Sequence, residues 1–102
     1  MMRTHGSGTL RAEHVGHTVT LCGWVRKRRD QGGVIFIDLW DRSGLVQTVF
    51  DSSKVPAAHA VADQCRGEFV LKLTGRVRLR PEGTANPKLP TGEIEIEALE
   101  AE

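Results

Sequence analysis

A two-residue alternation of apolar and polar side chains covers most of this chain and is interrupted once by a three- to four-residue period. Alternation puts every second side chain on one face of a β-strand, whereas the longer period puts apolar side chains on one face of a helix. The alternating stretches predict five strands, at residues 17–28, 34–41, 45–50, 69–80 and 93–99. A chain with this pattern is expected to be mostly β-structure.

The one predicted helix covers residues 55–66, between the third and fourth strands. Its apolar residues recur at helical spacing, Pro56 stands near its start and Gly67 follows its end. Turns are predicted at residues 30–33 and 41–44, and a loop rich in proline and glycine at residues 81–92. Gly23, in the middle of the first strand, predicts a bulge or a sharp bend.

This order of elements predicts an all-β fold with one helix, the five-stranded Greek-key barrel known as the OB-fold. The 102 residues are the length of a single domain. We expect residues 17–99 to form the barrel, after a polar N-terminal extension at residues 1–16 that holds one short helical turn at 10–14. Because a fold does not define a function, the binding residues need an argument of their own.

Charge is distributed unevenly along the chain, although the formal net charge is only +1. Five of the 13 acidic residues lie in the last ten positions, so residues 1–92 carry 14 basic and 8 acidic residues. Basic side chains gather at residues 26–29 and again at Arg76, Arg78, Arg80 and Lys88. Such clusters are typical of surfaces that meet phosphates, although charged strand ends are often simply solvated or paired with nearby aspartates.

Other classes of protein find little support in the sequence. No apolar run reaches the roughly 18 residues of a membrane span, and the N-terminus lacks the apolar region of a signal peptide. Cys22, expected on a strand, and Cys65, expected on the helix, are far apart and suit a reduced, cytosolic protein better than a disulfide scaffold or zinc site. No catalytic motif occurs, so we expect no catalysis, metal or cofactor within these residues.

Phe36 is the first candidate contact for a nucleic acid. The second strand alternates so that residues 35, 37 and 39 suit the core, which leaves Phe36 on the outer face. There it either stacks on a base or packs under the helix or a loop, and the periodicity leaves both open. Gln47 on the third strand is likewise either a reader of a base edge or a solvated polar residue.

Charged candidates lie on the flanking strands. Alternation puts Arg26 and Arg28 on one side of the first strand, and Lys27 and Arg29 on the other. On the closing strand the glutamates are expected to face water. The Glu95 carboxylate can accept two hydrogen bonds from a guanine edge, or it can pair with the arginines of the preceding strand, such as Arg78. Pairing is the interpretation we favour for Glu93 and Glu97.

Longer motifs resemble the N-terminal region of bacterial aspartyl-tRNA synthetases, which are class II aspartate–tRNA ligases. The resemblance covers essentially the whole chain. Its most specific parts are Arg3-Thr4-His5, Arg28-Arg29-Asp30-Gln31-Gly32-Gly33 and Gly92-Glu93-Ile94-Glu95 taken together. Shorter pieces such as Gly23-Trp24-Val25 and Phe36-Ile37-Asp38-Leu39 also fit, but lysyl- and asparaginyl-tRNA synthetases share them.

The resemblance implies an anticodon-binding domain in which Phe36 stacks on the central uridine of the anticodon. It implies that Arg29 and Gln47 contact anticodon bases or their backbone, and that Glu95 reads the first base, a guanine, with help from Asn86. The predicted RNA-binding set is Arg26, Arg28, Arg29, Phe36, Gln47, Arg78, Asn86 and Glu95. Two positions depart from the family: Val49 stands where a second aromatic is frequent, and Trp40 stands where arginine is common.

The resemblance also implies a parent enzyme that attaches aspartate to tRNA with ATP and Mg²⁺, as a homodimer in the cytoplasm. Its catalytic domain is expected to lie outside this chain, and the chain's partner is expected to be the anticodon loop of aspartate tRNA, with no membrane involved. The alternatives are a general single-stranded nucleic-acid module, the equivalent domain of an asparaginyl- or lysyl-tRNA synthetase, and a barrel whose basic rim meets an acidic protein.

Overall fold

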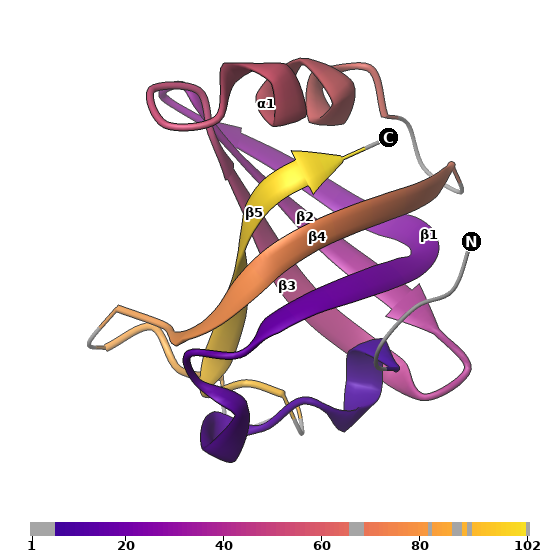
Figure 1. Ribbon diagram of the computed structural model, residues 1–102, viewed down its shortest axis with the longest axis vertical. Helices are drawn as coiled ribbons and strands as arrows, with labels where there is room; N and C mark the ends of the chain where they lie inside the picture. Colours follow the sequence, from indigo (N-terminus) through magenta and orange to yellow (C-terminus); the bar gives the residue numbers. More distant parts are fainter. Residues whose placement is uncertain (1–5, 66–68, 82, 87–88, 90, 102) are drawn as a thin grey trace.

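The computed structural model describes residues 6–65, 69–81, 83–86, 89 and 91–101. Within them, five strands close into a barrel in the order β1-β2-β3-β5-β4, and β4 pairs back onto β1 (Figure 1). The elements are β1 (Thr18–Gln31), β2 (Val34–Asp41), β3 (Gly44–Asp51), α1 (Pro56–Asp63), β4 (Val70–Leu79) and β5 (Ile94–Ala101). The predicted OB-fold is therefore confirmed, with α1 lying between β3 and β4 in sequence and covering one end of the barrel.

The hairpin between β1 and β2 is longer and tighter than predicted. Strand pairing continues to Gln31 opposite Val34. Gly32 and Gly33, with φ of 55° and 87°, make the whole turn. A two-residue turn whose central residues both have positive φ matches the natural twist of paired strands. The predicted end of the first strand at residue 28 was wrong for this reason.

A β-bulge lies in β1 between Val25 and Lys27, as Gly23 had suggested. At Gly23 itself a Cβ would stand 2.4 Å from the Trp40 carbonyl oxygen, so the close approach of β1 and β2 requires glycine. The bulge adds one residue and resets the alternation. Arg26 consequently lies over the outward-facing Trp40, and the prediction that it shares a side with Arg28 was wrong.

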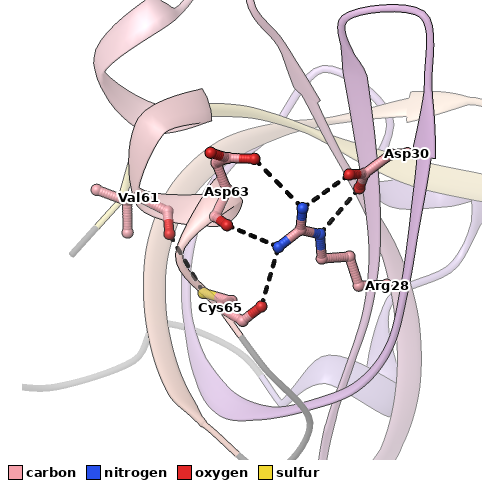
Figure 2. Close-up of polar contacts among 5 residues, drawn as sticks. All are labelled: Arg28, Asp30, Val61, Asp63 and Cys65. Atoms are coloured by element: carbon pink, nitrogen blue, oxygen red, sulfur yellow. Dashed lines mark hydrogen bonds and ion pairs between the residues drawn. The ribbon is translucent and has the colours of Figure 1, made fainter.

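Arg28 points toward α1 and fixes the end of that helix (Figure 2). Its Nη1 donates to the carbonyl oxygens of Asp63 and Cys65 at 2.7 and 3.1 Å, while Nε and Nη2 bind the Asp30 carboxylate at 2.8 and 2.7 Å. These contacts satisfy carbonyls that a helix end leaves free. The helix thus ends at Asp63, earlier than predicted, and Cys65 follows it; the expected stop at Gly67 lies outside the described residues.

The core is filled by the inward side chains of all five strands, and the N-terminal segment contributes to it as well. Leu10, which lies between the 3₁₀ turns η1 (Ser7–Thr9) and η2 (Ala12–His14), is fully buried. The Ser7 amide donates to the Asp41 carboxylate at 2.8 Å. This segment covers the barrel end opposite α1, so the expectation of a single turn in a polar extension was wrong (Figure 1). None of the helices in the described part of the chain is long and apolar enough to cross a membrane.

Candidate nucleic-acid interface

A groove of about 410 Å³ lies on the outer face of the barrel. All five strands and the segment after β4 contribute to it. Its lining residues are Arg29, Gln31, Val34, Phe36, Gln47, Val49, Asp51, Arg78, Arg80, Pro81, Thr84 and Glu95. The predicted residues Arg29, Phe36, Gln47, Arg78 and Glu95, which are dispersed over 67 positions of sequence, are therefore brought together.

Phe36 forms part of the groove wall. It lies opposite Arg29 on β1 and Val49 on β3, which gives it neighbours on both sides. The guanidinium carbon of Arg29 is 5.9 Å from the centre of the Phe36 ring, within the range of a cation–π contact. Of the two alternatives left open by the sequence, the structure shows a half-buried ring in a groove rather than one packed under α1.

A chain of hydrogen bonds crosses the floor of the groove. Arg29 Nη2 donates to Gln47 Oε1 at 2.9 Å, and Gln47 Nε2 donates to Glu95 Oε1 at 2.9 Å. From the other side, Arg78 Nε donates to Glu95 Oε2 at 2.8 Å. The amide of Gln47 is thus held in one orientation, with its oxygen toward a cation and its nitrogen toward a carboxylate.

Glu95 is only 2% exposed, so the expectation that every glutamate of β5 faces water was wrong for this residue. Strand β5 lies between β3 and β4, and the partners on those two strands satisfy both carboxylate oxygens. A carboxylate is tolerated in such a place only when it is paired and hydrogen-bonded. For Glu97 the predicted ion pairing is confirmed, with Arg78 at 3.3 Å and Lys54 at 3.8 Å.

Arg80 belongs to the groove but was absent from the predicted set. Its Nε donates to the carbonyl oxygen of Ile94 at 3.0 Å. Burial lowers the pKa of its guanidinium, against the opposing influence of Glu95 and Asp38. A guanidinium that has lost water in this way gains more from an incoming anion than an exposed one does. Its two-residue spacing from Arg78 was the sequence signal that placed it on the same side of the strand.

Gln31 and Thr84 were also missed. Gln31 reaches the groove because β1 continues further than its pattern predicted, and Thr84 belongs to the loop after β4. Nothing in the alternation of β1 marks its last residues as strand. Loop residues carry no periodic signal at all, so only the folded chain shows which of them meet the groove.

Three of the predicted residues lie outside the groove lining. Arg28 is engaged with the end of α1, and Arg26 lies over Trp40 further along β1. Asn86 is in the loop between β4 and β5, where its backbone N–H donates to the Gly92 carbonyl oxygen at 2.8 Å. The structure therefore divides the predicted set into five groove residues and three that are placed around it.

A closed five-stranded barrel with one capping helix and a polar, aromatic-containing groove over β2 and β3 defines an OB-fold with the face that binds oligonucleotides in this class of fold. Residues 19–102 match the family of OB-fold nucleic acid binding domains, and the chain belongs to that family.

Curated relatives point to one kind of enzyme. An aspartate–tRNA(Asp/Asn) ligase of Cyanothece sp. is 58% identical over 101 residues, which are 99% of this chain and 17% of that protein. A protein of the same name from Trichodesmium erythraeum is 56% identical over 97 residues, 95% of this chain and 16% of the relative. The chain thus spans about one sixth of the length of these relatives.

Solved structures agree on the fold. Asparaginyl-tRNA synthetase from Pyrococcus horikoshii, complexed with asparaginyl-adenylate, matches all of this chain and 22% of its own, with a TM-score of 0.81 and 25% identity. An OBody bound to hen egg-white lysozyme matches 99% of this chain and 92% of its own, with a TM-score of 0.82 and 24% identity. At that identity the second match bears on the fold alone.

Proposed function

We propose that this chain is the anticodon-binding domain of an aspartate–tRNA ligase and recognises the anticodon loop of its tRNA. The observation that carries the proposal is the groove in which one half-buried aromatic ring, Phe36, stands beside the hydrogen-bonded pair Gln47 and Glu95. The ring offers a surface for stacking and the pair offers acceptors and donors for base edges. Relatives of 56–58% identity that carry the name of this enzyme support it.

Phe36 serves as the stacking platform for the central base of the anticodon. Strand neighbours on both sides hold the ring, so little side-chain freedom is lost when a base covers it. Stacking of a base on an aromatic side chain contributes about 1–3 kcal/mol and tolerates any base. Phe36 therefore supplies affinity, and the selection among bases falls to its polar neighbours.

Glu95 and Gln47 read the first anticodon base. A carboxylate offers about four lone-pair positions, and in the free protein Glu95 uses one on each oxygen. A guanine edge presents two adjacent N–H donors that suit the remaining positions or replace the present partners. An adenine presents an acceptor where guanine presents its ring N–H, so its lone pair would face the acceptor oxygens of the carboxylate, which is unfavourable.

The arginines around the groove hold the RNA backbone. Arg29, Arg78 and Arg80 line the groove itself, and Arg26 and Asn86 lie beyond it. Charge-assisted bonds to phosphate are stronger than neutral ones. The guanidinium of Arg28 is already bound by Asp30 and by the end of α1, so we assign it to the fold rather than to RNA.

The rest of the enzymatic cycle belongs to the parent protein. We infer that the parent uses ATP and Mg²⁺ to attach aspartate to tRNA in the cytoplasm, as a homodimer whose catalytic domain lies outside this chain. The names of the relatives specify both aspartate and asparagine tRNA. Anticodons of these two tRNAs differ only in the third base. We therefore infer that the domain reads the first two bases and accepts either third base.

Titration of fluorescently labelled anticodon stem-loops tests the proposal. We expect the aspartate-type and asparagine-type loops to bind with similar affinity, and a loop with adenine in the first position to bind more weakly. Affinity should fall as salt rises, because each neutralised phosphate releases counterions. Equal affinity for a scrambled loop would instead indicate a general single-stranded binding module. Lack of binding to any RNA at low salt would overturn the proposal.

A further inference from the structure

A second aromatic cluster lies on the outer surface, away from the groove lining. It consists of Trp24 and Trp40, whose ring centres are 5.7 Å apart with the planes tilted by 48°, and of Arg26, whose guanidinium carbon is 5.4 Å from the centre of the Trp40 ring. Trp24 is 43% exposed and Trp40 is 39% exposed. We call these three residues the tryptophan cluster.

Packing of the core does not explain why two large aromatic side chains lie at these positions. The fold places Trp24 opposite Trp40 across β1 and β2, and both side chains point away from a core that is filled by other residues. Large aromatic side chains are usually well buried in a protein of this kind. An exposed pair with a cation over one ring is an arrangement that suits a planar ligand with a negative charge beside it.

The cluster continues the line of the groove. Phe36, Asp38 and Trp40 alternate along the outward face of β2, so Trp40 follows Phe36 by four residues on the same side. At the rise of a β-strand this separation is about 13 Å. A stacked nucleic-acid strand advances about 3.4 Å per nucleotide, so about four nucleotides span the distance. One short unpaired stretch of RNA is long enough to reach both aromatic sites.

The charges beside the cluster also fit RNA better than an apolar partner. Arg26 lies over the Trp40 ring, Lys27 follows it opposite Asp38, and both are exposed. The Asp38 carboxylate on this face is already held by Arg29 at 3.3 Å. A base on the Trp40 ring would bring its phosphate near these two cations. An apolar protein surface would have to bury them without partners, which is unfavourable.

We propose that the tryptophan cluster is a second stacking platform that binds an unpaired nucleotide of the same RNA, within about four nucleotides of the one on Phe36. The inference rests on the proposed function and extends it from a single groove to a path along β2. Trp40 supplies the stacking surface, Trp24 supports it from β1, and Arg26 holds the neighbouring phosphate. Because stacking tolerates every base, the platform adds affinity without adding selection.

Intrinsic fluorescence tests this platform directly, since the chain contains only two tryptophans and both belong to the cluster. The 102-residue chain is titrated with the aspartate-type stem-loop while tryptophan emission is recorded. Anisotropy of labelled RNA measures binding independently. We expect tryptophan emission to be quenched in step with RNA binding. In the complex, acrylamide should quench the remaining emission less than it does in the free protein.

Variants separate the platform from the groove. Trp40→Ala should weaken binding about fivefold or more, whereas Trp40→Phe should keep most of the affinity. The loss should be equal for the aspartate-type loop and for the loop with adenine in the first position, so discrimination stays unchanged. Leu99→Ala is the matched control, because Leu99 on β5 is 39% exposed, as Trp40 is. This variant should bind RNA like the unsubstituted chain.

The outcomes are distinguishable. RNA binding by anisotropy with unchanged tryptophan emission would overturn the platform and leave the proposed function intact. Emission that changes with protein concentration in the absence of RNA, together with dimers in sedimentation, would show the cluster to be a contact between copies and would also overturn it. Failure of every stem-loop to bind would overturn both proposals.

Discussion

Gln47 and Glu95, 48 residues apart in sequence, are joined by a hydrogen bond of 2.9 Å across the parallel pairing of β3 and β5. Arg29 holds the amide of Gln47 from one side and Arg78 holds the carboxylate of Glu95 from the other. The polar groups that would face a base in the proposed function are consequently oriented before it arrives. Such preorganisation lowers the entropic cost of recognition.

Phe36→Ala should weaken binding of the cognate stem-loop by about 1–3 kcal/mol, because the base loses its stacking surface. Phe36→Tyr keeps the ring and should retain most of the affinity. Anisotropy titrations of the three proteins measure the difference. If Phe36→Ala and the unsubstituted chain bind the stem-loop with the same affinity, Phe36 has no stacking role.

Glu95→Gln should reduce the preference for guanine over adenine in the first anticodon position by about 1–3 kcal/mol, since an amide cannot accept both donors of the guanine edge in the way a carboxylate does. The melting temperature should also fall, because the new amide nitrogen would face an N–H donor of Gln47 or of Arg78. The measurement compares the two stem-loops with each protein. An unchanged ratio of affinities would exclude Glu95 as the reader.

Arg28→Met should lower the free energy of unfolding by about 1–3 kcal/mol, because the carbonyls at the end of α1 lose a charged donor. The affinity of this variant for RNA should stay close to that of the unsubstituted chain. Arg29→Met is the contrasting variant on the next residue of β1, and it should weaken RNA binding with a smaller effect on stability. Chemical denaturation and RNA titration of both variants test this division of roles.

Gly8→Ala should be strongly destabilising, by about 2 kcal/mol or more, because a Cβ there would lie 2.0 Å from the Ser43 carbonyl oxygen. Gly32→Asn provides the control. That position has open space around it and a φ of +55°, which asparagine tolerates. Melting temperatures of the two variants should therefore differ widely, and similar values would contradict the tight packing of η1 on the β2–β3 hairpin.

Stability should decline in acid below about pH 4. The hydrogen bond from Arg28 holds the pKa of Asp30 below its usual 3.8, and Ser53 lowers the pKa of Asp51 in the same way. An unfolded chain binds protons more readily at these sites, so their contribution is present above the usual pKa and is lost as pH falls through the lowered one. Urea unfolding at a series of pH values should show a smaller loss of unfolding free energy in acid for Asp30→Asn than for the unsubstituted chain. An identical loss would exclude the Arg28–Asp30 pair as a cause of the acid sensitivity.

Much of the barrel was predictable because alternation is a local property. Ile35, Ile37 and Leu39 face the core as their spacing indicated, and Phe36 faces outward between them. The order of elements then allowed few topologies. Phe36 became a candidate because an aromatic ring on the outer face of a strand departs from what packing alone requires, whereas Gln47 became one mainly through the resemblance to a known family.

Other features depend on contacts between distant residues and left no local signal. The bulge after Val25 reverses which side chains of β1 share a face, and no periodic rule locates it to the residue. Burial of Glu95 depends on Gln47 and Arg78 together. Arg28 and Arg29 are adjacent in a run of cations, yet one holds a helix end and the other faces the groove, a difference that only tertiary structure decides.

The barrel is closed, so within the described residues every strand has a partner on both sides. Where these strands are paired on both sides, a ligand cannot join the sheet through backbone hydrogen bonds, which an open edge would have offered. On those paired stretches, recognition depends on the side chains that project from the sheet. Specificity can change one residue at a time while the sheet stays the same, and a single fold is thereby able to serve anticodons of different sequence.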